Sequence, residues 1–141
     1  MDRRNFLRKG CTGCAGLVLL GTATSALTGC STLPIVRVEP EANDLRIPLE
    51  RFAEQTMLIA RVDRLPFDVL AMKNTDGTFG AVYLQCTHED QPVTATTTGL
   101  HCPSHGSRFA IDGTLREGPA ARNLRRFTTI SDTTHLIIHL T

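Results

Sequence analysis

The chain has 141 residues, 41% of them hydrophobic, which is enough for one domain with an ordinary core. It contains no Trp and one Tyr, so few aromatic side chains are available for a nucleic-acid surface. The formal net charge of +1 hides an asymmetry: four basic residues and one acidic residue precede Cys30, which leaves more acidic than basic residues after it. The part of the chain after Cys30 is therefore nearly neutral, and its charge gives no reason to expect DNA, RNA or an anionic membrane surface as its partner.

Residues 1–30 have the pattern of an export signal rather than of a folded domain. The run from Arg3 to Lys9, with paired arginines, one spacer, Phe-Leu and a basic pair, resembles the twin-arginine signal. An uncharged stretch follows whose Gly and Thr content argues against a buried helix. Leu27-Thr28-Gly29-Cys30 resembles a bacterial lipobox, in which Cys30 would be lipidated. A retained membrane anchor and simple cleavage are the alternatives, and all three place the domain outside the cytoplasmic membrane.

The next segment, residues 31–44, carries two prolines and little apolar periodicity, and we expect it to be a tether. From residue 45 to 141, short apolar runs separated by turn signals predict an all-β domain. No helix longer than about two turns is indicated. We expect roughly eight to ten short strands in a small antiparallel β-barrel or sandwich. Its strands should include the segments 45–49, 57–62, 69–72, 79–84, 109–111, 127–130 and 135–140.

Two segments carry the candidate chemistry, and each contains one Cys and one His: Cys86-Thr87-His88 and Cys102-Pro103-Ser104-His105. Buried Cys and His need no function, but two such pairs in one small domain are poorly explained by coincidence. A structural zinc ion takes two Cys and two His, although zinc fingers usually draw like ligands from one loop. A cluster held by two cysteines on one iron and two histidines on the other requires one of each from two adjacent loops.

The ligand spacings and the order of the motifs that follow them resemble the Rieske 2Fe-2S family over residues 45–141. The further motifs are Gly106-Ser107-Arg108-Phe109, Asp112-Gly113 and Gly118-Pro119-Ala120. The resemblance implies a small β fold with two cluster-binding loops at one tip. It implies that Cys86 and Cys102 ligate the inner iron and that His88 and His105 ligate the outer iron near the surface. It also implies that the Ser107 hydroxyl donates to a bridging sulfide.

The chain departs from the family in its predicted cluster environment. The disulfide that joins the ligand loops in cytochrome bc subunits would fall at Gln91 and Ser104, so it cannot form. Phe109 stands where the family has a tyrosine that donates to a ligand-cysteine sulfur. Because hydrogen bonds to cluster sulfurs favour the reduced state, we expect a potential below that of the quinol-oxidising members.

The resemblance implies one-electron transfer, as a carrier or as a subunit of a redox complex rather than as a stand-alone enzyme. Glu89 and Asp90 follow His88 and would suit a positively charged partner such as a c-type cytochrome, although they could equally form a solvated turn. The other contexts are the iron–sulfur subunit of a cytochrome bc complex and the small subunit of a molybdenum oxidoreductase. A structural zinc domain is a remote alternative. An oxygenase would need a second iron site, and only His101, His135 and His139 remain to supply imidazoles.

Export by a twin-arginine signal agrees with a metal cluster in the folded domain. That route carries folded proteins, so the cluster could be inserted in the reducing cytoplasm before export. Unfolded, Cys86 and Cys102 would reach an oxidising compartment as free thiols.

Overall fold

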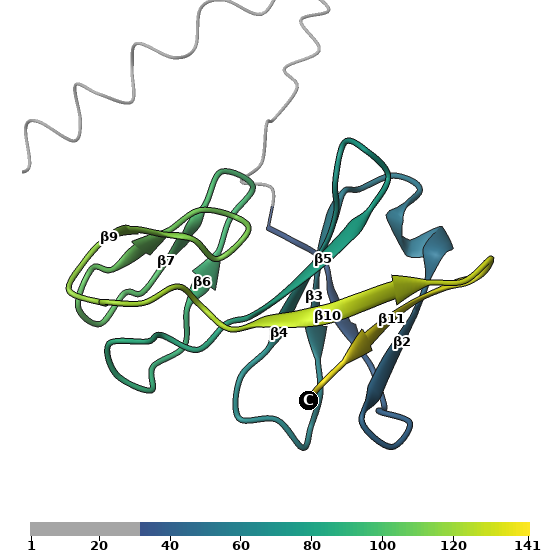
Figure 1. Ribbon diagram of the computed structural model, residues 1–141, viewed down its shortest axis with the longest axis horizontal. Coiled ribbons are helices and arrows are strands. Elements are labelled where there is room, and N and C mark those ends of the chain that lie inside the picture. Colours follow the sequence, from purple (N-terminus) through teal and green to yellow (C-terminus); the bar gives the residue numbers. More distant parts are fainter. Residues whose placement is uncertain (1–31) are drawn as a thin grey trace, which may run out of the picture.

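The computed structural model describes residues 32–141, which form a nearly all-β domain of two sheets (Figure 1). The seven-stranded sheet has the order β1-β3-β4-β5-β10-β11-β2, and the four-stranded sheet has the order β6-β7-β8-β9. One short 3-10 helix, η1, lies between β2 and β3. The elements are β1 (Ile35–Arg37), β2 (Asp44–Pro48), η1 (Leu49–Phe52), β3 (Met57–Arg61), β4 (Val69–Lys73), β5 (Phe79–Tyr83), β6 (Thr94–Ala95), β7 (Leu100–His101), β8 (Arg108–Phe109), β9 (Leu115–Glu117), β10 (Arg126–Ser131) and β11 (His135–His139). The predicted all-β class is confirmed.

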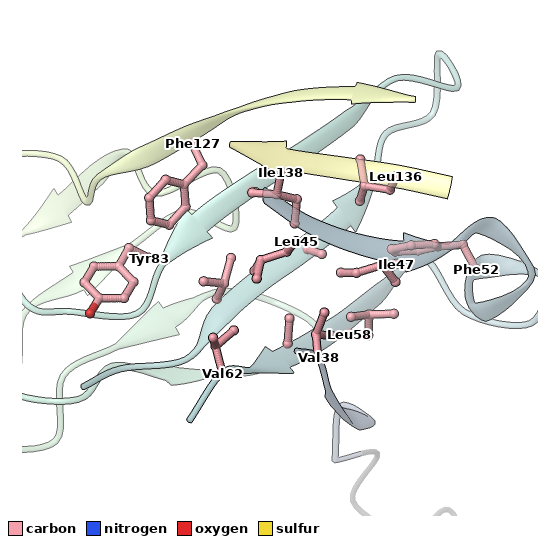
Figure 2. Packing of buried hydrophobic residues seen from close by; sticks show 14 residues of the cluster. Val38, Leu45, Ile47, Phe52, Leu58, Val62, Tyr83, Phe127, Leu136 and Ile138 are labelled. Atoms are coloured by element: carbon pink, nitrogen blue, oxygen red, sulfur yellow. The ribbon is translucent and has the colours of Figure 1, made fainter. Parts of the chain in front are cut away.

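In the large sheet, β2 and β3 bury alternate residues, as the apolar alternation in the sequence requires, whereas β4 is buried on both faces. In β2, Leu45 and Ile47 are fully buried, and they lie opposite Ile138 and Leu136 of β11. Figure 2 shows these side chains converging on one core with Leu58 of β3 and, towards the other end, Tyr83 and Phe127. All its strand pairs are antiparallel except β1 with β3.

The folded domain begins before residue 45, where the sequence analysis placed its start. Strand β1 lies inside the expected tether and pairs in parallel with β3, with Ile35 opposite Ile59. Val38, just after this strand, is only 8% exposed and belongs to the core. A three-residue strand is too short to show a period of its own, and it is fixed here by pairing with a strand that follows some twenty residues later.

The small sheet stands beside the large one and carries the second core of the domain. Its strands are two or three residues long, shorter than the runs on which the sequence analysis relied. The described residues therefore contain more strands than expected. Leu100 of β7 and Phe109 of β8 are buried together with Leu84, Cys86 and Cys102. This second core supports the loops described next.

No helix in the described part of the chain is long and apolar enough to cross a membrane. The export signal and the lipidation of Cys30 fall in residues 1–31, outside the described residues.

Candidate metal centre

Loop 1, residues 85–92, connects β5 of the large sheet to β6 of the small sheet. An isolated bridge between Gln85 and Pro92 closes its base. Inside it, the Cys86 amide donates to the Gln91 carbonyl at 2.9 Å, and the Gln85 side chain donates to an Asp90 carboxylate oxygen at 2.8 Å. Loop 1 is thus held by its own hydrogen bonds, with Cys86 at its base and His88 near its tip.

Loop 2, residues 102–107, is the tight connection between β7 and β8. The Cys102 amide donates to the Ser107 carbonyl at 2.9 Å, and the Gly106 amide donates to the Cys102 carbonyl at 3.0 Å. Gly106 has a φ of 82°, a left-handed conformation that glycine adopts without the steric cost of a Cβ. The glycine in the motif is therefore required by the turn that presents His105.

The four predicted ligands lie together, two buried and two exposed. Cys86 is 2% exposed and Cys102 is fully buried, and both sulfur atoms are thiols rather than a disulfide. The rings of His88 and His105 are exposed, with centroids 5.0 Å apart and planes at 83°. This arrangement places soft sulfur donors inside and nitrogen donors at the surface.

The Cys86 thiol has a pKa below its ordinary value. Burial by itself raises the pKa, but hydrogen bonds from the backbone amides of His88 and Glu89 outweigh it, helped by the Cys102 and Ser107 side chains. The thiolate is the form that binds metal. The backbone of loop 1 is thus already arranged to stabilise a negatively charged sulfur.

A third segment, residues 118–124, holds both loops, and we call it the bracket. The Ala120 amide donates to the buried Ser107 hydroxyl oxygen at 3.0 Å, which fixes loop 2. The Thr87 hydroxyl donates to the Arg122 carbonyl at 2.7 Å, which fixes loop 1. Ser107 is the one polar side chain found buried within residues 32–141. Because its oxygen accepts from Ala120, its hydrogen remains free to donate towards sulfur.

The bracket supplies a connection between the loops in a chain that has no disulfide there. Gln91 and Ser104 occupy the positions of the family's disulfide, and Gln91 instead accepts the Cys86 amide through its backbone. Phe109 is buried, 3% exposed, and offers no hydroxyl donor. Sequence reasoning missed the roles of Thr87 and Arg122, because a hydrogen bond across 35 residues leaves no local pattern.

The remaining histidines are not in the proposed ligand set. His101 is exposed on β7, and His135 and His139 lie on β11. On β11, Nδ1 of His139 lies 2.7 Å from a carboxylate oxygen of Asp44 in β2. Sequence did not show that Glu89 reaches His105, with Oε2 3.8 Å from Nδ1. These two contacts depend on strand and loop pairing, which the sequence pattern does not specify.

The fold and the donor set define a redox metalloprotein with mixed sulfur and nitrogen ligation on a small β scaffold. The Rieske [2Fe-2S] domain profile matches residues 48–128, which is more than half of the chain. The protein belongs to the Rieske family. Its cofactor is therefore a Rieske-type 2Fe-2S cluster, and the two buried thiols and two exposed imidazoles fit that group.

Several solved structures are similar to this chain, two of the three named here with a TM-score above 0.5. A chain in the complex of reduced oxygenase and oxidised ferredoxin of carbazole 1,9a-dioxygenase is 18% identical, with a TM-score of 0.52 over 71% of this chain and 95% of that one. The quaternary ammonium Rieske monooxygenase CntA is 13% identical, with a TM-score of 0.54 over 68% of this chain and 31% of that one. The plasma membrane Rieske protein PetC3 from Synechocystis PCC 6803 is 24% identical, covering 69% of this chain and 86% of that one at a TM-score of 0.48. No curated protein sequence matches significantly.

The family assigns electron transfer to this protein. A Rieske cluster, when bound, takes up and releases single electrons. In this chain two buried thiols and two exposed imidazoles come together. Loops 1 and 2 and the bracket hold these groups in place by the hydrogen bonds described above.

Proposed function

We propose that Cys86 and Cys102 ligate one iron of the cluster and that His88 and His105 ligate the other, with the Ser107 hydroxyl donating to a cluster sulfur. The observation that carries this proposal is the meeting of two buried thiols and two exposed imidazoles at one end of the domain. Each loop supplies one of each kind, which suits two adjacent irons of different ligation better than one zinc ion.

Spectroscopy of the purified protein and of matched variants tests this assignment. The reduced wild type should give an EPR signal with an average g of about 1.9, which a zinc protein lacks. Cys86→Ser and His105→Ala should lose the signal and half or more of the bound iron. His101→Ala is the control, because this histidine is adjacent to Cys102 but exposed on β7, and it should keep both. An EPR-silent protein with one zinc per chain would overturn the proposal.

We further propose that the protein works as an electron carrier or iron–sulfur subunit with a positively charged partner, such as a c-type cytochrome or a basic face of a larger redox complex. Loops 1 and 2 contain Glu89 and Asp90 and no Lys or Arg. Both carboxylates are exposed, and that of Glu89 lies beside the imidazoles. Arg122 of the bracket adds one exposed positive charge at the edge of this surface, so loops 1 and 2 with Arg122 keep a negative balance. Two carboxylates disfavour an apolar quinol pocket and favour electrostatic docking.

Salt dependence tests the partner chemistry. The oxidation rate of the reduced protein by a basic c-type cytochrome should fall as ionic strength rises, since the attraction is screened over about 10 Å at 0.1 M salt. A rate that rises with salt would contradict a positively charged partner.

The cellular setting is a proposal from the sequence alone. We propose that residues 1–30 direct export through the twin-arginine route, and that Cys30 anchors the protein by lipidation at the periplasmic side of the membrane. Replacing Arg3 and Arg4 by Lys should keep the protein in the cytoplasm. Cys30→Ser should abolish labelling by a radioactive fatty acid and release the domain into the soluble fraction. Export that survives the double replacement would contradict the proposal.

A further inference from the structure

A groove lies beside loop 2 and is separate from the exposed histidine tip. Its volume is about 1010 Å³. Leu100 of β7 and Phe109 of β8 line its inner part, and Cys102, one of the proposed ligands, also lines it. Pro103 and Gly106 of loop 2 form one border. The groove therefore borders Cys102, which itself stays fully buried.

The groove carries charge of the sign opposite to that of the tip. Arg108 and Arg116 line it and are exposed. Asp112 is the one carboxylate in its lining, and a guanidinium nitrogen of Arg126 lies 2.9 Å from it. That carboxylate is therefore neutralised by a residue outside the groove.

The two lining arginines differ in how firmly they are held. Arg108 pairs with Glu117 at 3.4 Å, but both side chains are about 70% exposed. An exposed pair of this kind contributes little and exchanges easily. The Arg116 side chain makes no hydrogen bond or ion pair with any residue of the described range 32–141. Arg116 is thus available to a ligand, and Arg108 becomes available when a ligand carboxylate replaces Glu117.

We propose that this groove is a second docking face, which takes an acidic segment of a redox protein beside loop 2. The inference rests on the proposed electron-transfer function and adds a partner class to it. Carboxylates of the segment would pair with Arg108 and Arg116. The first thirty residues of the chain are not the occupant, because they carry a net positive charge that does not complement a basic groove.

Two faces of opposite charge would let the carrier tell its two partners apart. A basic partner docks at the carboxylates beside His88, and an acidic partner docks at the groove beside Cys102. Each contact passes one electron, so the centre is reduced by one partner and oxidised by the other.

Two small cobalt(III) oxidants of opposite charge test the two docking faces independently. Tris(oxalato)cobaltate(III) is a trianion that presents carboxylates, and tris(phenanthroline)cobalt(III) is a trication; each accepts one electron and becomes cobalt(II). The full-length reduced protein is mixed with each oxidant at low ionic strength in a stopped-flow instrument. The double variant Arg108→Gln/Arg116→Gln should react about three- to tenfold more slowly with the anion. Its rate with the cation should not fall.

The matched control removes the same net charge elsewhere. The control double variant is Arg37→Gln/Arg51→Gln. Arg37 is exposed and ion-paired with Asp63 at 2.9 Å, and Arg51 is exposed in η1. The rates of this variant with both oxidants should stay within about twofold of wild type. An equal loss in both double variants, or an equal loss with both oxidants, would overturn the groove proposal.

A decaglutamate peptide tests the same groove without the cluster. It should shift the NMR signals of the Thr96 and Leu100 amides in the wild type, and the shifts should vanish in Arg108→Gln/Arg116→Gln. Shifts that persist in this variant would contradict the proposal. Because this readout needs no bound iron, a failed groove and a failed ligand assignment give different results.

Discussion

The charge of Glu89 should lower the reduction potential of the centre, and Glu89→Gln removes it with little change in shape. The Glu89 carboxylate lies 3.8 Å from a ring nitrogen of His105, and its side chain is 56% exposed. Reduction adds one negative charge to the centre, and a neighbouring carboxylate opposes that charge. The variant should therefore be reduced more easily than the wild type.

The size of the shift follows from the distance and the exposure. Two unit charges about 4 Å apart in water interact by about 1 kcal/mol. For a one-electron couple about 1.4 kcal/mol corresponds to about 59 mV, so an interaction of about 1 kcal/mol corresponds to roughly 42 mV. Salt screens an exposed carboxylate, so we expect a rise of about 20–40 mV.

A potentiometric titration followed by EPR or circular dichroism measures the shift. Glu54→Gln is the control, because this exposed glutamate follows η1 in the other part of the domain, and its potential should stay within about 10 mV of wild type. A potential for Glu89→Gln that falls, or that moves no further than the control, would refute the reasoning.

Three further predictions follow from single contacts. Phe109→Tyr should raise the potential, because a new hydroxyl donor in the buried core around the thiols would stabilise the reduced state; an unchanged redox titration would show that the ring does not point towards a sulfur. Thr87→Val removes the hydroxyl that ties loop 1 to the bracket, so iron loss to a chelator should become faster than in the exposed-strand control Thr128→Val. The pKa of Asp132 is lowered from 3.8 to about 2, chiefly by backbone amides of Thr134 and His135. Its charge therefore stabilises the fold above pH 3.8, and this contribution is lost as the pH falls towards about 2. Asp132→Asn should lose less stability than wild type over that interval, as measured by urea denaturation; equal losses would refute the assignment.

The sequence alone predicted the all-β class, the family and the candidate ligands. Cys86, His88, Cys102 and His105 stand in two short motifs whose spacing is set by the turns themselves, as the hydrogen bonds within loop 2 and the left-handed Gly106 show. Strand β2 was also visible, because one of its faces is buried and alternation records that burial locally.

Only the tertiary structure revealed strand β1, the bracket and the contact of Glu89 with His105. Each depends on segments that lie far apart in the chain: β1 pairs with β3, and Thr87 reaches Arg122 across 35 residues. Hydrogen bonds and charges of this kind are short-ranged in space but leave no period in the sequence. The packing of the two sheets against each other determines which thiols are buried, which imidazoles are exposed and where the oppositely charged faces lie. Local sequence pattern does not specify that packing.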